Sequence, residues 1–313
     1  MTARRALVTG AAGFLGTHLL KRLDSPGWQA TGIGRQVTSP NTLACDITDA
    51  SRVAEVVSQT LPDVIFHAAA LMPAAASSAT ADDFLRVNVG GTLNLLEAVR
   101  NFVPHARVML VTSSAMYGIA EAADGVIHEE STLRPVNSYG MSKATQHLIG
   151  YQFYAQYKLD VVRVCPFNLI GYGLPKGLVA SDFAAQIVAI ERGQQEAIIR
   201  VGDLSGKRDF LDVQDAVSAL VSLVEAGRAG ESYNLASAQA VPIIELLHDM
   251  LSMSKAAIEV QPRPNIVKNA VPIQIGAHDK LTALTGWTPQ IALKQSLSDV
   301  LAYWRTVKIK ENA

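Results

Sequence analysis

Two side chains that are able to move a proton lie four residues apart in this sequence. Tyr139 and Lys143 are the ends of the segment Y-G-M-S-K, and side chains at positions i and i+4 share one face of a helix. Because a nearby ammonium favours the phenolate, we expect Lys143 to lower the pKa of Tyr139, and Tyr139 to act as a general acid or base. Ser113 follows a predicted strand and is expected to hydrogen-bond the carbonyl or hydroxyl group being transformed. Spacing alone would also fit a surface pair on an amphipathic helix.

A glycine-rich turn is the second feature with chemical meaning. Residues 10–16 read G-A-A-G-F-L-G and lie between the strand-like run Ala6–Thr9 and the helical stretch Thr17–Asp24. Glycines there let the backbone turn tightly and approach a pyrophosphate, which then sits at the N-terminus of the helix. In this position the turn predicts a dinucleotide site, and Lys143 would then also reach the nicotinamide ribose. The residues expected to contact the cofactor here are Gly10, Gly13, Phe14, Leu15 and Gly16.

The end of the next predicted strand indicates which dinucleotide is bound. Dehydrogenases that use NAD usually carry an acidic residue there, which binds the ribose 2′-hydroxyl. This chain has Gly34 and Arg35 instead, which leave room for a 2′-phosphate and provide a guanidinium to pair with it. We therefore expect NADP(H); the alternative is that Arg35 is a solvated loop cation. Asp46 and Ile47 follow the third predicted strand and are expected to meet the adenine, and the alternative for Asp46 is a helix N-cap.

Short apolar runs alternate with longer helical patterns through the first half of the chain. The runs expected to form strands are Ala6–Thr9, Ala30–Ile33, Leu43–Cys45, Val64–Ala68, Val108–Thr112 and Val161–Val164. Strands that alternate with helices imply βαβ units, so the predicted fold class is α/β, with a doubly wound parallel Rossmann sheet. We expect residues 1–165 to form the NADP-binding domain, with returns near 209–238, and residues 166–313 to form mainly a smaller C-terminal substrate-binding lobe. The segments expected to return are Asp209–Val213 and Tyr233–Leu235.

The bulk composition argues against several classes of function. With 49% apolar and 18% charged residues, the 313-residue chain is expected to be globular. A formal net charge of −1 provides no general attraction to nucleic acid or to an anionic membrane. The sequence shows neither a signal peptide nor an apolar run of membrane length, so we expect a cytoplasmic location. Cys45 and Cys165 lie far apart in apolar runs and are expected to be buried thiols, with neither a disulfide nor a metal site.

Together these motifs resemble the extended short-chain dehydrogenase/reductase family, also called the NAD-dependent epimerase/dehydratase family, over nearly the whole chain. The matching segments are the glycine turn at 10–16, His67–Ala70, Asn88–Thr92, the serine loop at 112–118, Tyr139 with Lys143, Phe167 with Asn168, and Arg208–Phe210. The resemblance implies an NADP-dependent oxidoreductase that acts on a nucleotide-linked sugar.

The resemblance also implies roles for residues that spacing alone leaves unassigned. Those expected at the cofactor are His67, Ala68, Ala69, Ala70, Asn88 and Pro166, beside the catalytic Tyr139 and Lys143. Those expected at the substrate are Ser114, Asn168 for the sugar, Arg208 for the diphosphate, and a second basic residue, which is Arg263 or Lys268. Otherwise His67 would cap a strand end, and Arg208 would pair with Asp209 or Asp212.

Within the family, the stretches 201–215 and 285–289 look most like those of the reductases that act on GDP-4-keto-6-deoxymannose. Related dehydratases carry acidic residues just after the serine or threonine of the serine loop, whereas this chain has Ser114 and Ala115, so loss of water is disfavoured. We therefore expect NADPH-dependent reduction of a 4-keto-6-deoxy nucleotide sugar to a GDP-6-deoxyhexose. The alternatives are a nucleotide-sugar 4-epimerase with tightly bound NAD and a catalytically silent NADP-binding regulator. Tyr172 stands where the family often has proline, which leaves the sugar open.

The resemblance further implies a homodimer. The stretches Leu93–Phe102 and Ser138–Tyr157 are expected to be long helices, and their counterparts in the family pack as a four-helix dimer interface. The apolar residues in this pattern are Leu148, Ile149, Phe153 and Tyr154. The alternative is that this apolar face only covers the sheet.

Overall fold

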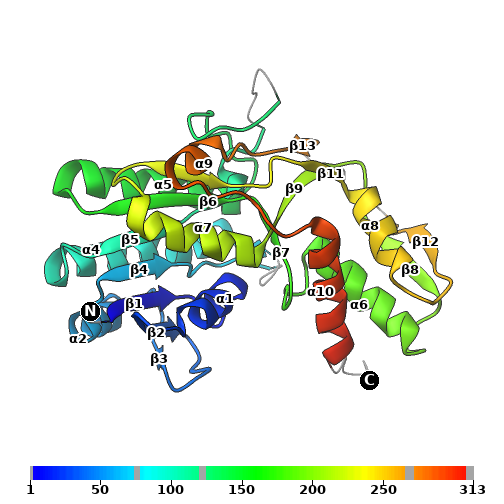
Figure 1. Ribbon diagram of the computed structural model, residues 1–313, viewed down its shortest axis with the longest axis horizontal. Coiled ribbons are helices and arrows are strands. Elements are labelled where there is room, and N and C mark those ends of the chain that lie inside the picture. Colours follow the sequence, from blue (N-terminus) through cyan, green and yellow to red (C-terminus); the bar gives the residue numbers. More distant parts are fainter. Residues whose placement is uncertain (1–2, 74–77, 120–124, 265–270, 308–313) are drawn as a thin grey trace.

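The larger part of the molecule is built around a parallel sheet (Figure 1). The computed structural model describes residues 3–73, 78–119, 125–264 and 271–307. Seven strands lie in the order β10-β6-β5-β4-β1-β2-β3, and every neighbouring pair is parallel. The bounds are β1 Arg4–Thr9, β2 Trp28–Gly34, β3 Thr42–Ala44, β4 Val64–His67, β5 Arg107–Val111, β6 Val161–Pro166 and β10 Ser232–Leu235. The predicted doubly wound α/β fold is confirmed, and all six strands expected in the first half are present.

Helices cover both faces of this sheet, because successive side chains of a strand point to opposite sides. Val8 of β1 packs in one core cluster with α1 and α7, whereas its neighbour Leu7 packs in another with α2, α4 and α5. Strands buried on both faces need apolar side chains at nearly every position, as the runs in the sequence have. The bounds are α1 Phe14–Leu23, α2 Ala50–Thr60, α4 Gly91–Phe102, α5 Ser138–Tyr157, α7 Val213–Ala226 and α9 Asp279–Thr285.

A smaller lobe stands beside the carboxyl ends of the strands and has a core of its own (Figure 1). Its helices are α6 Val179–Glu191, α8 Ile243–Ser252 and α10 Leu293–Thr306. Its strands are β7 Asn168–Ile170, β8 Ile198–Val201, β9 Lys207–Asp212, β11 Ala240–Pro242, β12 Glu259–Pro262 and β13 Ile273–Gln274. Strands β7, β11 and β13 all pair with β9, and β12 pairs with β8. None of the helices in the described ranges is long and apolar enough to cross a membrane.

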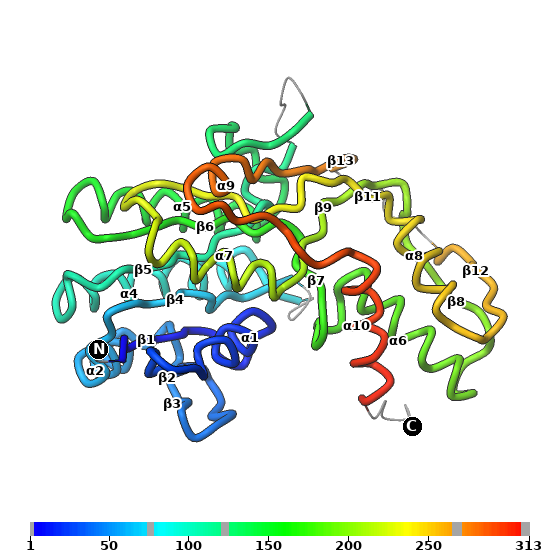
Figure 2. Tube along the Cα trace, in the orientation of Figure 1, coloured from blue at the N-terminus to red at the C-terminus, as the bar shows by residue number. Residues whose placement is uncertain are grey.

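The chain passes between sheet and lobe repeatedly, as the trace in Figure 2 shows. Of the two segments expected to return to the sheet, Tyr233–Leu235 does so within the edge strand β10. The other, Asp209–Val213, lies mostly in β9, which is the central strand of the second sheet and pairs with β7, β11 and β13.

Three aspartates in and after β9 connect these parts. The buried carboxylate of Asp209 accepts hydrogen bonds from the Ser237 backbone N–H and hydroxyl at 2.8 and 2.7 Å, and from backbone N–H groups of Ala238 and Gly276 at 3.0 and 3.2 Å. Burial raises the pKa of Asp209, and these donors oppose that increase. Asp209 therefore joins β9 to the segments that follow β10 and β13.

The other two aspartates flank the start of α7. Asp212 caps the helix through Gln214 and accepts a 2.6 Å hydrogen bond from Ser296 of α10. Asp215 accepts hydrogen bonds from the backbone N–H groups of Gln290 and Ile291, at 3.0 and 2.9 Å. The carboxylates of Asp209 and Asp212 are thus engaged within the fold, and neither is paired with Arg208.

Replacing Asp209 by Asn should lower the free energy of unfolding by about 2–4 kcal/mol, because one oxygen becomes an NH₂ group facing buried backbone donors. Urea unfolding followed by circular dichroism measures the difference. The matched control is Asp249→Asn at an exposed position of α8, which should change stability by less than about 0.5 kcal/mol. Equal unfolding midpoints for the two variants would contradict this role of Asp209.

Candidate active site

The glycine turn brings the backbone of β1 close to the loop after β4. Gly10 has φ +71°, and a Cβ there would lie 2.8 Å from the backbone of Ala69. A Cβ on Gly16 would lie 2.1 Å from the carbonyl oxygen of Gly10. Gly13 is the N-cap of α1, and no side chain caps the first turn. The turn therefore presents the positive end of a helix dipole at the carboxyl edge of the sheet, which is the arrangement that binds a pyrophosphate.

The end of β2 leaves space beside an exposed cation. A Cβ on Gly32 would meet Ala11 at 2.7 Å, so this glycine is required by packing against the turn. A Cβ on Gly34 would meet only a carbonyl oxygen of Gln36 at 3.8 Å, so packing does not demand that glycine. Arg35 is exposed directly after this open position.

Asp46 lies close enough to Arg35 for the guanidinium to lower the pKa of its carboxyl group. Its carboxylate accepts hydrogen bonds from the backbone N–H and hydroxyl of Thr48 at 2.9 and 2.8 Å. The pKa of Asp46 is lowered chiefly by the Thr48 backbone bond, with Arg35 as a smaller cause. The N-cap of α2 is Asp49, so the alternative interpretation of Asp46 as a helix cap is wrong. Ile47 is buried, with its side chain against Gly91.

The structure brings Ser113 and Tyr139 together. Ser113 follows β5, and Tyr139 lies in the first turn of α5, whose N-cap Asn137 accepts a 2.8 Å hydrogen bond from the Gly140 N–H. Ser113 lies close enough to Tyr139 to lower the pKa of its phenol. The ring of Phe84 packs edge-on against Tyr139, with centroids 6.0 Å apart. Apolar packing on one side and a hydroxyl partner on the other hold the phenol in place.

Lys143 is buried one turn further along α5. Its Nζ donates hydrogen bonds to the Val111 carbonyl at 3.0 Å and to Gln146 Oε1 at 2.7 Å. Burial lowers the pKa of Lys143 to about 7 and raises the pKa of Tyr139 to about 12, against a smaller lowering by Ser113. The expectation that Lys143 lowers the pKa of Tyr139 is therefore wrong for this structure. Desolvation of the phenol dominates, and the amine is directed toward Val111 and Gln146.

Asn88 supports the same group of residues from a π-helical turn, Leu85–Gly90. Its Oδ1 accepts from the Leu71 N–H at 2.7 Å, and its Nδ2 donates to Ser142 Oγ at 2.9 Å. Ser142 in turn donates to the carbonyl oxygen of Tyr139 at 2.7 Å. The side chain therefore links the loop after β4 to the first turn of α5, a use of an irregular helical turn that is common at functional sites.

The segment His67–Ala70 divides into a buried histidine and three half-buried alanines. His67 Nδ1 lies 2.8 Å from Thr9 Oγ1, and its Nε2 lies 2.9 Å from Thr92 Oγ1. Burial lowers the pKa of His67 to about 3, so the ring is neutral. Both ring nitrogens are engaged within the protein. The three alanines follow β4, and the buried Pro166 ends β6, so these residues lie at the carboxyl edge of the sheet.

Two of the expected substrate residues make contacts within the protein. Ser114 is buried, its hydroxyl 3.4 Å from Gln274 Oε1, while Gln274 Nε2 donates to the Ser114 carbonyl at 2.9 Å. Asn168 Nδ2 donates to the Asp209 carbonyl at 2.8 Å. These bonds hold the serine loop and β7 against the second sheet.

The expected basic residues lie in different places. The half-buried Arg208 donates to the Lys207 and Pro272 carbonyls at 2.8 and 3.5 Å, and burial lowers its pKa. Arg263 is exposed, donates to the Arg200 carbonyl at 3.3 Å, and lines with Arg200 a cavity of about 210 Å³ between α6 and the β8–β12 pair. Arg208 is not part of that cavity lining. Lys268 lies outside the described residues.

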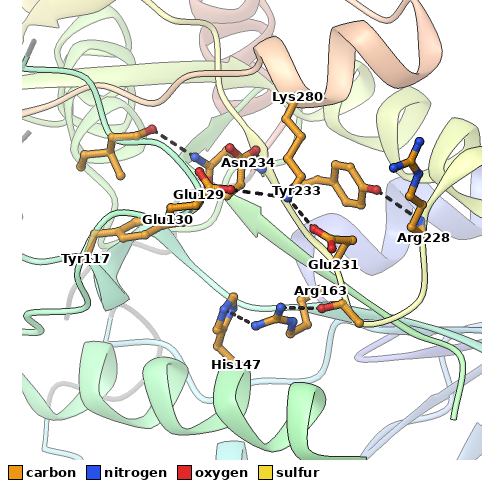
Figure 3. A network of polar contacts seen from close by, with 12 residues as sticks. Tyr117, Glu129, Glu130, His147, Arg163, Arg228, Glu231, Tyr233, Asn234 and Lys280 are labelled. Atoms are coloured by element: carbon orange, nitrogen blue, oxygen red, sulfur yellow. Dashed lines mark hydrogen bonds and ion pairs between the residues drawn. The ribbon is translucent and has the colours of Figure 1, made fainter. Parts of the chain in front are cut away.

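A second network of hydrogen bonds, which the sequence did not indicate, joins the serine loop to the edge strand β10 (Figure 3). Tyr117 Oη donates to Asn234 Oδ1 at 3.0 Å, and Asn234 Nδ2 donates to the Ile127 carbonyl at 3.1 Å. The carboxylate of Glu129 accepts from the Asn234 N–H at 2.8 Å. More than a hundred residues separate Tyr117 from Asn234, so no local pattern could have revealed this pair. The same reason applies to Gln274, which is 160 residues from its partner Ser114. Gln146 is only three residues from Lys143, but its other partner, Thr92, is 54 residues away.

Comparisons with known proteins give the family. Residues 6–236 match the model of the NAD dependent epimerase/dehydratase family. The chain is 31% identical to GDP-6-deoxy-D-mannose reductase of Pseudomonas aeruginosa, over 97% of this chain and 98% of that protein. It is 27% identical to GDP-6-deoxy-D-talose 4-dehydrogenase of Aggregatibacter actinomycetemcomitans, over 90% of this chain and 91% of that protein.

Solved structures agree with this assignment. The structure of RMD from Pseudomonas aeruginosa complexed with NADPH is similar with a TM-score of 0.88 at 30% identity, and covers 97% of this chain and 99% of that one. A Thermus thermophilus UDP-glucose 4-epimerase in complex with NAD shares the fold, with a TM-score of 0.84 at 22% identity over 97% of this chain and all of that one. The chain therefore belongs to the NAD dependent epimerase/dehydratase family, as its motifs predicted.

Proposed function

We propose that the protein uses NADPH to reduce the 4-keto group of a GDP-linked 4-keto-6-deoxy sugar, with GDP-4-keto-6-deoxymannose as the substrate. The observation that carries this proposal is the close approach of Ser113 and Tyr139 at the same edge of the sheet as the uncapped, glycine-lined N-terminus of α1. The relatives named GDP-6-deoxy-D-mannose reductase and RMD complexed with NADPH support the substrate and the cofactor.

Tyr139 is suited to donate a proton in this reaction. Bound NADPH supplies the hydride that reaches the carbonyl carbon, so the carbonyl oxygen must gain a proton. Burial holds the pKa of Tyr139 at about 12, and the phenol is therefore protonated at neutral pH. Ser113 orients the substrate oxygen by a second hydrogen bond. Lys143, one turn further along α5, would contact the nicotinamide ribose of bound NADPH.

The residues after Ser113 fit reduction better than dehydration. Neither Ser114 nor Ala115 has a side chain that titrates near neutral pH, and the Ser114 carbonyl and hydroxyl face Gln274. Loss of water would need an acid or base at these positions, whereas ketone reduction needs only the tyrosine and the hydride. The complete serine, tyrosine and lysine set also disfavours a silent regulator.

The cavity between α6 and the β8–β12 pair is proposed as part of the diphosphate or nucleotide subsite. Its lining carries two cations, Arg200 and Arg263, and one carboxylate, Asp182, so it provides a local excess of positive charge in a chain whose net charge is −1. We assign Arg208 to the diphosphate and Asn168 to the sugar. The nitrogen donors of both side chains now bond to backbone carbonyls, and on binding they would instead donate to a phosphate or a hydroxyl group of the substrate.

We further propose a homodimer formed through α4 and α5. Leu148 of α5 is 59% exposed, Tyr151 is 50% exposed, and Leu93 of α4 is 38% exposed. Large apolar side chains gathered on adjacent helices indicate an interaction surface. Of the four residues expected there, Ile149 and Phe153 pack against the sheet core instead, because they lie on the inner side of α5. We place the protein in the cytoplasm, in keeping with its two buried free thiols.

Replacing Tyr139 by Phe should lower kcat by about 10²–10⁴-fold and leave NADPH binding intact, because only the proton donor is removed. NADPH consumption with GDP-4-keto-6-deoxymannose, made in situ by a separate dehydratase, measures turnover, and fluorescence titration measures binding. Tyr157→Phe near the end of the same helix is the control and should retain wild-type turnover. Unchanged turnover in Tyr139→Phe would exclude this mechanism. A wild-type protein that reduces no 4-keto nucleotide sugar and keeps its cofactor through dialysis would instead be the epimerase.

Replacing Arg35 by Ala should raise the KM for NADPH by about 10–100-fold, since one charge-assisted contact to the 2′-phosphate is lost. The KM for NADH should hardly change, because NADH lacks that phosphate. Arg22→Ala, an exposed cation in the last turn of α1, is the control. If both coenzymes are affected equally, Arg35 does not read the 2′-phosphate.

Replacing Leu148 by Glu should shift the protein from dimer to monomer, because two carboxylates would be buried in a symmetric contact. Sedimentation velocity distinguishes one chain of 33.4 kDa from a species of about twice that mass. Val260→Glu, also an exposed apolar residue but located in the lobe, should leave the dimer unchanged. A wild-type protein that sediments as a monomer would exclude the proposed interface.

A further inference from the structure

The buried amine of Lys143 is the end of a continuous chain of polar side chains. Lys143 Nζ donates to Gln146 Oε1 at 2.7 Å, and Gln146 Nε2 donates to Thr92 Oγ1 at 2.7 Å. Thr92 Oγ1 also lies 2.9 Å from His67 Nε2, and His67 Nδ1 lies 2.8 Å from Thr9 Oγ1. All five side chains are buried. The chain therefore runs from α5 through α4 and β4 to β1.

Each hydrogen bond in this chain has a fixed direction. An ammonium has no acceptor, so Gln146 must turn its oxygen to Lys143 and its NH₂ to Thr92. The Thr92 hydroxyl donates to the Asn88 carbonyl at 2.6 Å, so its oxygen accepts from both Gln146 and His67. His67 accordingly carries its proton on Nε2, in agreement with a neutral ring. Its Nδ1 then accepts from the Thr9 hydroxyl, and Thr9 accepts from the Ala69 N–H at 3.0 Å.

The charge environment of Lys143 is equally specific. In the described chain, the titratable groups that act electrostatically on it are His67 from β4 and Cys165 from β6, and Tyr139 lies one turn away on its own helix. His67 is neutral, and burial raises the pKa of both the Cys165 thiol and the Tyr139 phenol. Among the described residues, no carboxylate is hydrogen-bonded to the amine or ion-paired with it. The side chain that accepts its hydrogen bond is the neutral carboxamide of Gln146.

We propose that Gln146 is the positioning residue for Lys143: it holds the amine by a neutral oxygen, without a counter-charge, and is itself held by Thr92, His67 and Thr9. The proposal rests on the reductase function proposed above, in which Lys143 would hold the nicotinamide ribose beside Tyr139. Gln146, together with Thr92, His67 and Thr9, thus determines where the amine lies and how easily its ammonium form loses a proton.

A neutral partner at this position has a chemical consequence. A carboxylate within hydrogen-bonding distance would stabilise the ammonium and raise its pKa by about one to three units. The carboxamide gives a hydrogen bond without that stabilisation, so burial leaves the pKa of Lys143 at about 7. Binding of substrate and cofactor near the remaining N–H of the amine can then change its protonation within the physiological range.

The test uses two variants that act in opposite directions. In Gln146→Glu the pKa of Lys143 should rise by at least one unit, whereas in Gln146→Met, which has similar length but no comparable acceptor, it should fall. NMR titration of isotopically labelled lysine side chains in the unliganded full-length protein measures this directly. The alkaline limb of the kcat profile for reduction should move with it, upward for Glu and downward for Met. Gln152→Glu, on the exposed side of the same helix, is the control.

A second pair of variants tests the chain behind Gln146. Thr92→Val removes the oxygen that holds the Gln146 NH₂ group and should shift the alkaline limb in the direction of Gln146→Met, while Thr92→Ser should restore it. A merely structural role would lower kcat equally at every pH. The proposal is overturned if Lys143 titrates at the same pH in wild type, Gln146→Glu and Gln146→Met, or, should the Gln146 variants not fold, if Thr92→Val and Thr92→Ser have identical profiles.

The outcomes also separate this proposal from the function on which it rests. A wild-type protein that fails to reduce any 4-keto nucleotide sugar refutes the reductase, and the NMR titration then still decides the role of Gln146. A wild-type protein that reduces the substrate, with variants whose Lys143 pKa does not move, refutes only the role of Gln146.

Discussion

The burial of one amine is the constraint on which much of this structure depends. Moving Lys143 away from water is costly unless its N–H groups find acceptors, and here they find a β5 carbonyl and Gln146. Gln146 then needs an acceptor for its own NH₂ group, and so on through Thr92 and His67 to β1. Because an unsatisfied member of such a chain is costly, the network holds α5, α4, β4 and β1 in a single relative arrangement.

The same arrangement places the loops that carry the proposed chemistry. Thr9 ends β1 immediately before Gly10, and its hydroxyl accepts from the Ala69 N–H, where Gly10 also makes its close approach. Asn88, whose carbonyl accepts from Thr92, ties the loop after β4 to the start of α5 through Ser142. The proposed cofactor turn and the tyrosine helix are thus connected through side chains, and movement of one strains the other.

The lobe depends on a different set of polar contacts. Asp209, Asp212 and Asp215 follow one another along β9 and α7, and each accepts backbone or hydroxyl donors from segments that come later in the chain. A buried carboxylate is favourable only when donors surround it, so these later segments are held where the donors are required. Gly276 is one of these donors, and Gln274, two residues before it, donates to the carbonyl of Ser114. The lobe and the serine loop therefore share their support.

The sequence by itself determined the parallel sheet and the turn at Gly10–Gly16, and it indicated Ser113 and Tyr139 as parts of one site. These follow from local periodicity and from the rule that parallel strands end at one edge. Only the tertiary structure decided the pKa of Tyr139, the direction of the Lys143 amine, and the packing of Ile149 and Phe153 against the sheet. A pKa depends on how far the surrounding protein excludes water, and a hydrogen-bond partner such as Gln274 or Asn234 is selected by packing across the fold. Neither quantity is carried by the spacing of residues along the chain.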